Sequence, residues 1–226
     1  MIGIICAINI EADYLKGLIS DEKTAVYSGI EFCSGKISGK DVVVATSGAG
    51  KVFAAMCTQT MINLYSPQVI INSGVAGALK PGMKIFDVVI ADKTCQHDMD
   101  TTAVGDPIGL ISGINKIYFE CDERVKTVLS DAVRCSGLTA ITGTVATGDK
   151  FVTDKISKQN IAKTFDACAC EMEGGSIGQV CFAAGIPYGV LRTVSDGDGG
   201  NVDYKKFAPK AAVNAAKIAE KFIELW

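Results

Sequence analysis

Short apolar runs alternate along the whole chain with longer segments in which apolar residues recur at helical spacing. Residues 2–8 form an isoleucine-rich run, as expected of a strand that is buried on both faces. Between residues 121 and 135, Val125, Val128, Leu129 and Val133 fall on one stripe, which is typical of an amphipathic helix. The same reasoning predicts strands at residues 30–37, 41–46, 68–72, 85–91, 140–147, 167–170 and 188–194, and helices at residues 11–19, 51–65, 173–184 and 204–225.

This alternation of strands and helices predicts an α/β fold, a three-layer sandwich around a mostly parallel central mixed sheet. The length of 226 residues fits one domain, and no linker, internal repeat or low-complexity stretch divides residues 1–226. In such sheets, ligands bind at the carboxyl ends of the strands, where loops carry polar side chains. We therefore look for chemistry at the points where the predicted strands end.

Composition excludes several classes of protein. Apolar residues make up 48% of the chain and charged residues 21%, so a disordered chain is excluded. The 22 basic and 25 acidic residues leave a net charge of −3, and only Arg124, Arg134 and Arg192 are arginines. Nucleic acid is therefore not an expected partner, because the chain has neither a net positive field nor an arginine cluster.

The cysteines and the apolar runs bear on the compartment. No run approaches the roughly 20 apolar residues of a membrane span, and the first residues lack the basic leader of a signal peptide. The nine cysteines are odd in number and contain no C-x-x-C pair, which favours free thiols over disulfides or a zinc site. We expect a cytoplasmic protein with no membrane partner.

Two motifs resemble ligand sites without completing them. Residues 47–51 (Ser-Gly-Ala-Gly-Lys) follow a strand and open a helix, but they lack the spacing of a phosphate loop and the third glycine of a dinucleotide site. His97 stands beside Asp98 and Asp100, which allows either a metal or acid–base site or a hydrogen-bonded structural cluster. We favour the structural interpretation, because no second histidine is present, and we expect neither a metal nor another cofactor.

Carboxylates at the ends of three predicted strands are stronger candidates for catalysis than these two motifs. Glu11 follows the first strand, Glu171 and Glu173 follow the strand at residues 167–170, and Asp196 follows the strand at residues 188–194. These strand ends open on the same edge of a parallel sheet. Carboxylates at a helix start would explain Glu11 and Glu173 individually, but not Asp196, which we place in a flexible loop at residues 195–200. Separated carboxylates of this kind suit a general base and a general acid.

Seven blocks of the sequence, in order, resemble the 5′-methylthioadenosine/S-adenosylhomocysteine nucleosidases of the nucleoside phosphorylase superfamily. The blocks are residues 2–5 with Glu11, residues 47–51, 72–77 (Asn-Ser-Gly-Val-Ala-Gly), 97–100, 147–152 (Thr-Gly-Asp-Lys-Phe-Val), 170–173 (Cys-Glu-Met-Glu) and 192–196 (Arg-Thr-Val-Ser-Asp). Each block alone is moderately specific, whereas seven in register from residue 2 to about 210 are strongly specific. The resemblance implies a nucleoside phosphorylase-like fold and hydrolysis of the bond between adenine and ribose.

The resemblance also implies a role for each matching residue. Asp196 would be the acid that protonates the departing base, and Glu11 the base that activates water. The remaining residues would bind substrate: Phe151 and the backbone of Val152 at the purine, Glu173 and Met172 at the ribose, Glu171 and Arg192 at the water and sugar side, Ala76 and Gly77 as close backbone, and Ser195 and Tyr204 around them. The implied partners are a small nucleoside, water and a second copy of the chain, whose residues 101–104 would complete the neighbouring pocket.

The sequence departs from the family pattern around the sugar. Val75 replaces a hydroxyl residue that positions water, and Tyr204 stands where a phenylalanine lines the alkylthio pocket. Thr101 and Ala49 replace larger apolar residues. We therefore expect an intact nucleoside site with a more polar pocket for the 5′ group.

Two other functions remain open at this stage. A purine nucleoside phosphorylase would use phosphate instead of water, but it would clamp the phosphate with several arginines, and Arg192 is the only one near the expected site. Arg124 and Arg134 belong to the amphipathic helix, where we expect them on the solvated face. A non-catalytic nucleoside-binding protein would have no need for both Glu11 and Asp196.

Overall fold

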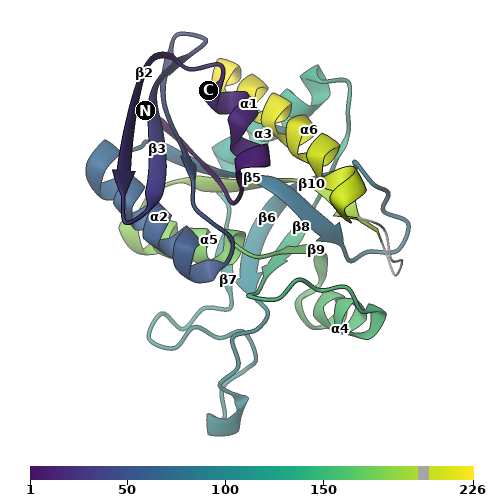
Figure 1. Ribbon diagram of the computed structural model, residues 1–226. Helices are drawn as coiled ribbons and strands as arrows, with labels where there is room; N and C mark the ends of the chain where they lie inside the picture. Colours follow the sequence, from purple (N-terminus) through teal and green to yellow (C-terminus); the bar gives the residue numbers. More distant parts are fainter. Residues whose placement is uncertain (198–203) are drawn as a thin grey trace.

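The computed structural model describes residues 1–197 and 204–226, which form helices around a sheet of ten strands (Figure 1). The helices are α1 (Asn9–Lys16), α2 (Lys51–Tyr65), η1 (Thr102–Val104, a 3-10 helix), α3 (Glu123–Cys135), α4 (Lys155–Phe165), α5 (Gly174–Ala184) and α6 (Tyr204–Leu225). The strands are β1 (Ile2–Cys6), β2 (Ser20–Tyr27), β3 (Ile30–Ile37), β4 (Lys40–Thr46), β5 (Val69–Ala78), β6 (Val88–Gln96), β7 (Tyr118–Glu120), β8 (Ala140–Thr147), β9 (Ala167–Glu171) and β10 (Tyr188–Asp196).

The sheet is mixed and in part closed. Its strand order is β10-β6-β8-β9-β5-β1-β4-β3-β2, and β5 pairs with β10 as well, so β5, β9, β8, β6 and β10 form a circuit. The pairs β1–β4, β1–β5, β5–β10, β6–β8 and β8–β9 are parallel. The hairpins β2–β3 and β3–β4 are antiparallel, as are the pairs of β6 with β7 and β10 and of β5 with β9.

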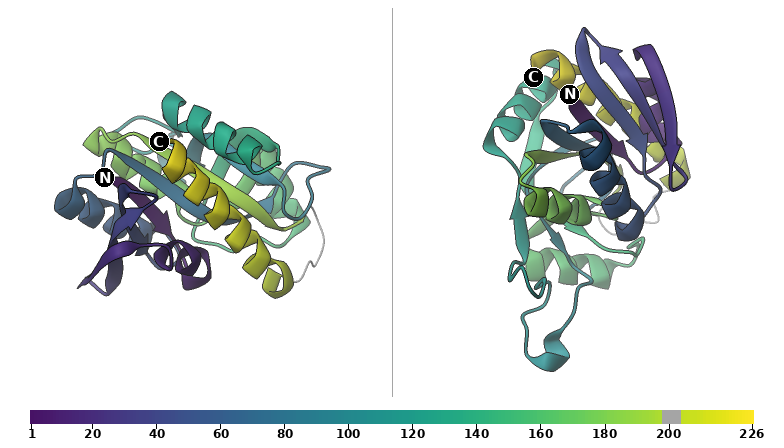
Figure 2. Two further views of the ribbon diagram at one scale, coloured as in Figure 1. Left: turned by 90° about the horizontal axis from the view of Figure 1, so that it is seen from above. Right: turned by 90° about the vertical axis from the view of Figure 1, so that its left-hand side faces the viewer.

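Helices cover both faces of the sheet. Helices α2 and α5 pack side by side on one face, and α6 packs between α1 and α3 on the other (Figure 2). Strand β1 shows why both faces are apolar: Ile5 packs in the core under α2 and α5, whereas its neighbour Ile4 packs in the core under α1, α3 and α6. The three-layer α/β architecture expected from the sequence is confirmed.

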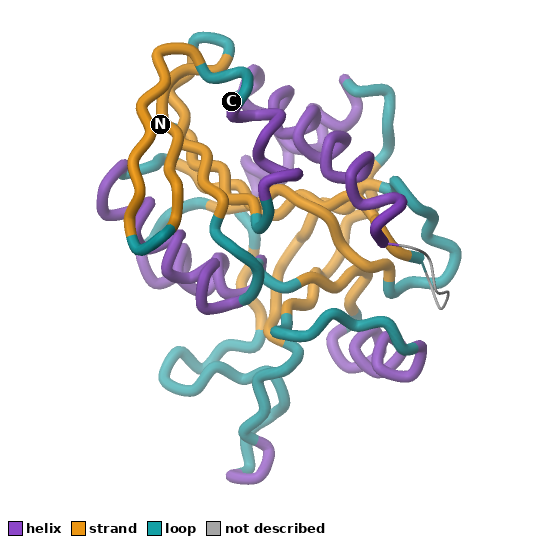
Figure 3. Tube along the Cα trace, in the orientation of Figure 1, coloured by secondary structure: helices purple, strands orange, loops and turns teal. Residues whose placement is uncertain are grey.

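A long connection leaves the body of the molecule between β6 and β7. Figure 3 shows it as a loop that extends away from the sheet and carries η1 at its far end. The side chain of Val104, in η1, is 80% exposed. This segment is therefore poorly placed to contribute to a site on its own sheet.

The structure corrects several predicted boundaries. Strands β2 and β7 and helix α4 were not predicted, and β5 and β6 extend beyond the predicted residues 68–72 and 85–91. Helix α1 spans Asn9–Lys16 instead of the predicted residues 11–19, so Glu11 lies within its first turn instead of starting it. Asp196 is the last residue of β10 and not part of a flexible loop, because β10 continues beside β5 as far as the pairing of Asp196 with Gly77. The rest of that predicted loop, residues 198–200, lies outside the described residues.

Among the described residues, no helix combines the length and the apolar character needed to cross a membrane.

Candidate active site

A pocket opens where the carboxyl ends of β1, β5, β9 and β10 meet, with about 580 Å³ of empty space including its mouth. It is lined by Ala7, Ile8, Glu11, Ala49, Val75, Ala76, Gly77, Lys150, Phe151, Val152, Cys170, Glu171, Met172, Glu173, Ser195, Asp196 and Tyr204. All the site residues implied by the resemblance except Arg192 line this one pocket.

Glu11 is held by backbone N–H groups from two elements. Its Oε2 accepts hydrogen bonds from the N–H groups of Ala7 (2.9 Å) and Ile8 (3.2 Å), which precede α1. Its Oε1 accepts a hydrogen bond from the N–H of Val75 in β5 at 3.0 Å. Glu11 is only 4% exposed, and burial raises its pKa although Arg192 and these hydrogen bonds oppose the shift. A buried carboxylate with a raised pKa is a better base near neutral pH than an ordinary glutamate.

Val75 contributes a backbone hydrogen bond to the site but no side-chain hydroxyl. Its N–H binds Glu11, whereas its side chain lines the pocket and offers no hydroxyl. The backbone of β5 is close to the carboxylate here, because a Cβ on Gly74 would lie 2.5 Å from Oε1 of Glu11. The glycine thus allows the glutamate to reach β5.

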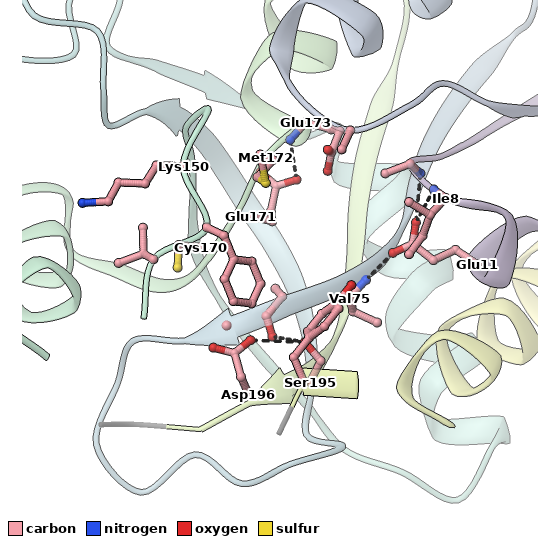
Figure 4. A pocket seen from close by; sticks show the side chains of 17 residues that line it. Ile8, Glu11, Val75, Lys150, Cys170, Glu171, Met172, Glu173, Ser195 and Asp196 are labelled. Atoms are coloured by element: carbon pink, nitrogen blue, oxygen red, sulfur yellow. Dashed lines mark hydrogen bonds between the residues drawn. The ribbon is translucent and has the colours of Figure 1, made fainter. Parts of the chain in front are cut away.

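Asp196 lies on a different side of the pocket from Glu11 (Figure 4). Its Oδ1 accepts a hydrogen bond from the Ser195 hydroxyl at 3.2 Å, and its Oδ2 contacts the Lys158 ammonium at 2.8 Å. The backbone of β5 passes closely, since a Cβ on Gly77 would lie 2.8 Å from Oδ2. The two carboxylates are therefore fixed independently, one from α1 and one from β10.

Glu171 is bound on both oxygens. Oε2 accepts hydrogen bonds from the Gly174 N–H at 2.7 Å and from the Arg192 guanidinium, and Oε1 accepts one from the Thr147 hydroxyl. Burial acts to raise the pKa of Glu171, but the Arg192 cation and these hydrogen bonds outweigh it and lower the pKa. The Glu171 carboxylate therefore has two roles: it accepts a hydrogen bond from the first residue of α5, and it lines the pocket.

Arg192 lies behind the pocket wall instead of in it. The residue is 1% exposed, and its guanidinium binds Glu171 and the side chain and carbonyl oxygen of Asn72. A carboxylate oxygen of Glu173 lies 3.9 Å away. The arginine therefore interacts with the pocket carboxylates from outside the cavity and does not present a free guanidinium to a ligand.

Glu173 occupies the position just before α5. Its Oε1 accepts a hydrogen bond from the N–H of Gly50 at 2.8 Å, so the glycine-rich segment at residues 47–51 binds a carboxylate of the protein. Gly50 has a φ of 98°, a conformation that L side chains rarely adopt. Burial and the neighbouring negative charge of Glu171 raise the pKa of Glu173 to about 8. At neutral pH this carboxyl holds a proton and can both donate and accept a hydrogen bond.

Two aromatic rings stand at the mouth. Phe151 is 50% exposed, and its ring meets that of Tyr204 edge to face, with centroids 5.2 Å apart. Half-exposed phenylalanine on a pocket rim is available to stack on a flat ligand, whereas a core residue would be covered. Val152, next in the chain, is buried and lines the same wall.

Asp98 organises the His97 segment. Asp98 accepts hydrogen bonds from the Lys51 ammonium (2.7 Å) and the Asp149 N–H (2.8 Å), as the structural interpretation predicts. His97 itself has no partner at Nε2 in the described part of the chain; it packs against Gly148, and burial lowers its pKa. Within residues 1–197 and 204–226, no three metal-ligating side chains gather at one point.

Lys158 is the main residue that the sequence did not indicate. It is 3% exposed on α4, a helix that was not predicted, and it contacts Asp196. Its position was visible in principle: residues 158, 161 and 165 share one helix face, and Ile161 and Phe165 are both buried. A lysine on an otherwise apolar stripe is the signal that a buried partner exists.

A family model and a known nucleosidase match the chain over nearly its whole length. A model of the phosphorylase superfamily matches residues 1–224. The 5′-methylthioadenosine/S-adenosylhomocysteine nucleosidase of Shewanella sp. (strain W3-18-1) is 35% identical over 226 residues, covering 99% of this chain and 98% of the relative.

Solved structures agree in fold. A nucleosidase of the same name from Neisseria meningitidis, in complex with methylthio-immucillin-A, superposes with a TM-score of 0.94 at 31% identity, covering 99% of this chain and 98% of the other. The futalosine hydrolase of Helicobacter pylori strain 26695 superposes with a TM-score of 0.93 at 32% identity, covering 99% and 97%.

Proposed function

This chain belongs to the 5′-methylthioadenosine/S-adenosylhomocysteine nucleosidases of the phosphorylase superfamily, and we propose that it hydrolyses methylthioadenosine and S-adenosylhomocysteine to adenine and the free sugar. One observation carries the proposal: two buried carboxylates, Glu11 and Asp196, are fixed independently on different sides of one pocket. Hydrolysis of an N-ribosyl bond needs a base for water and an acid for the leaving group, and the pocket has a candidate for each.

The chemistry follows from these two positions. Glu11 takes a proton from water as the water oxygen attacks C1′ of the ribose. The bond between C1′ and N9 breaks and its electron pair moves onto the purine, while Asp196 gives its proton to N7, so that adenine leaves as a neutral molecule. Negative charge nearby stabilises the cationic character that the sugar acquires in the transition state.

We assign the purine to the side of the pocket around Asp196. Phe151 is exposed on the rim and can stack on the base, and the adjacent backbone of Val152 can read its hydrogen-bonding edge. Ala76 and Gly77 have no bulky side chain, so a flat ligand can approach the backbone of β5. Ser195 binds Oδ1 of Asp196 and holds the acid in place.

We assign the ribose to the side around Glu173. Its carboxyl, protonated at neutral pH, can exchange hydrogen bonds with the sugar hydroxyls, and Met172 packs beside it. Arg192 acts through Glu171 and supports this side of the pocket from behind. Val75 offers no side-chain hydroxyl to the attacking water, so Glu11 contributes more to positioning that water than it would in the family pattern.

Phosphorolysis is the alternative, and the charges around Glu11 disfavour it. A phosphate dianion there would meet the carboxylates of Glu11 and Glu171, while Arg192 is already bound to Glu171. Arg124 and Arg134 are exposed on α3, as expected from the sequence. No arginine of the described residues is thus free to clamp phosphate at this pocket.

The test is product analysis with methylthioadenosine, with and without phosphate at millimolar concentration. We expect adenine and free methylthioribose in both reactions, at the same rate. Formation of methylthioribose 1-phosphate, or a strict requirement for phosphate, would assign the chain to the phosphorylases. Binding of methylthioadenosine without any cleavage would leave a nucleoside-binding protein.

We also propose a homodimer in which residues 101–104 complete the neighbour's pocket. In support, η1 lies at the far end of the loop that leaves the body, and Val104 exposes an apolar side chain there. Thr101 does not line its own pocket; its hydroxyl donates a hydrogen bond to Asp106 at 2.9 Å. Within one copy of the chain, the polar 5′ pocket expected from the sequence therefore depends on Tyr204, and Thr101 would contribute to it only from the second copy.

A cytoplasmic location is the last part of the proposal. All nine cysteines are free, and every one except Cys135 is buried. Thiols persist in a reducing compartment, which is what supports this location.

A further inference from the structure

Lys158 makes a buried contact with the carboxylate that we assign as the acid. Its ammonium lies 2.8 Å from Oδ2 of Asp196 and donates a second hydrogen bond to the carbonyl oxygen of Gly197 at 3.0 Å. The two side chains are 4% and 10% exposed. Long cationic side chains are seldom buried to this extent, so a specific partner must hold this one.

The lysine stands behind Asp196 as seen from the cavity. It does not line the pocket, whereas Asp196 and the residue bound to its other oxygen, Ser195, both do. A ligand in the pocket can therefore meet Asp196 without meeting Lys158. Any effect of Lys158 on the reaction therefore acts through the groups that it binds, the Asp196 carboxylate and the Gly197 carbonyl.

Groups from the other packed elements do not substitute for this cation. Cys170 of β9 faces the pair, and burial raises the pKa of its thiol to about 12, so it stays neutral. Tyr204 of α6 also faces Asp196, and burial and the nearby carboxylates raise the pKa of its hydroxyl, so it stays neutral as well. Lys158 is the one cationic side chain of the described residues bonded to this carboxylate.

We propose, as an extension of the function proposed above, that Lys158 is a positioning residue that sets the acid strength of Asp196. In the step concerned, the O–H bond of Asp196 breaks and the N7–H bond of the purine forms, while the electron pair of the C1′–N9 bond moves onto the base. The Lys158 ammonium stabilises the carboxylate that this transfer leaves behind. Solvent returns a proton to Asp196 after adenine has left.

The charge of the lysine is what matters at this step. As Asp196 gives up its proton, negative charge develops on its carboxyl group, and the ammonium 2.8 Å from Oδ2 stabilises that charge. Removing the ammonium must therefore slow the proton transfer and lower kcat.

The experiment compares wild type, Lys158→Met, Lys158→Arg and a control, Lys163→Met, which removes an exposed cation from the same helix. The kcat and KM for methylthioadenosine are measured for each. We expect Lys158→Met to lower kcat about tenfold or more with little change in KM. Lys158→Arg, which keeps the charge, should restore most of the wild-type kcat, and Lys163→Met should match wild type.

A second measurement separates acid strength from a structural role. The 7-deaza analogue of methylthioadenosine has no N7 to accept a proton, so its dissociation constant should be the same in Lys158→Met and wild type. If Lys158→Met does not fold, Lys158→Gln, which keeps a hydrogen-bond donor without the charge, takes its place. An unchanged kcat in the uncharged variant, or a loss of affinity for the 7-deaza analogue in that variant, overturns the role of Lys158. Absence of cleavage by wild type would overturn the proposed function instead.

Discussion

At the residue scale, the site depends on carboxylates that differ in how the protein binds them. Glu11 is bound by three backbone N–H groups, Glu171 by a guanidinium, and Asp196 by an ammonium and a hydroxyl. Among the residues that the structure describes, Glu173 has only the Gly50 N–H as a close donor. The four groups are all carboxyl groups, so it is their different surroundings, more than their residue type, that assign them roles as a base, an acid or a sugar ligand.

The assignment of Asp196 as the acid predicts the effect of Asp196→Asn. The amide has the same size and can still accept a hydrogen bond from Lys158, so we expect the fold to persist. It cannot donate an acidic proton to the purine, and turnover should fall by about 10²–10⁴. Steady-state kinetics with methylthioadenosine, with thermal unfolding as the check on folding, provide the test. Turnover near that of wild type would remove Asp196 from the mechanism.

The raised pKa of Glu173 predicts how stability changes with pH. In the folded protein its pKa is about 8, above the ordinary value of 4.5, so the folded state retains a proton that the unfolded state loses. The corresponding stability is fully present below pH 4.5 and is lost as the pH rises through 8. Glu173→Gln keeps the acceptor for Gly50 and never ionises.

We therefore expect Glu173→Gln to match wild type in thermal unfolding at about pH 4 and to exceed it by a growing margin as the pH rises to 9. The gain should be about 2–4 °C for each kcal/mol. Glu120→Gln, which alters an exposed carboxylate, is the matched control and should show no such crossover. A constant difference between Glu173→Gln and wild type across this range would contradict the raised pKa.

Tyr204 predicts the preference for the 5′ substituent. If its hydroxyl faces that group, an apolar methylthio substituent leaves it without a partner. Tyr204→Phe should then raise the ratio of kcat/KM for methylthioadenosine over adenosine by about tenfold. An unchanged ratio would mean that the hydroxyl does not face the 5′ group.

At the element scale, the site is positioned by short strands that end in polar residues. Most of these strands could be predicted from the sequence. The runs that became β1, β4 and β9 are apolar and sharply bounded. Strand β2 escaped prediction because nearly all its residues are exposed, so no alternation marks it. Helix α4 escaped because Lys158 interrupts its apolar stripe, and only the contact with Asp196, 38 residues away, makes that burial stable.

The same limit applies to the site. The residues at strand ends could be placed on one edge from the sequence, and their shared pocket follows from that placement. The position of Arg192 behind the wall could not be predicted, because it depends on the partners Glu171 and Asn72 from other strands. The extension of β5 through Gly77 was hidden by the polar Asn72 and Ser73, which are both 1% exposed in the structure.

The close passage of β5 by Glu11 predicts the effect of Gly74→Ala. The added Cβ would lie 2.5 Å from Oε1, so the carboxylate must move away from the N–H of Val75. We expect kcat to fall by about 10²-fold, the scale of a misplaced catalytic group. Gly17→Ala, where the nearest atom would lie at an ordinary 3.4 Å, is the control. Equal activity of the two variants would mean that Glu11 is not held by β5 as described.

At the scale of the whole molecule, the sheet gathers the site from the chain's two halves, and the loop with η1 extends away from it. The dimer proposal predicts that Val104→Asp, which places a charge at an apolar contact, yields monomers and lowers activity. Sedimentation together with kinetics measures both effects. Thr164→Asp, at an exposed position on α4, is the control and should remain dimeric. A wild-type protein that sediments as a monomer and is fully active would contradict the proposed completion of the pocket.

The central claim is that water, activated by Glu11, is the nucleophile at C1′. Its most direct test is the reaction of methylthioadenosine in ¹⁸O-labelled water that also contains millimolar phosphate, followed by mass spectrometry of the sugar quenched before its anomeric oxygen exchanges. The account predicts one ¹⁸O atom in the free methylthioribose, none in adenine, and no sugar phosphate. Unlabelled sugar, or methylthioribose 1-phosphate in its place, would contradict it.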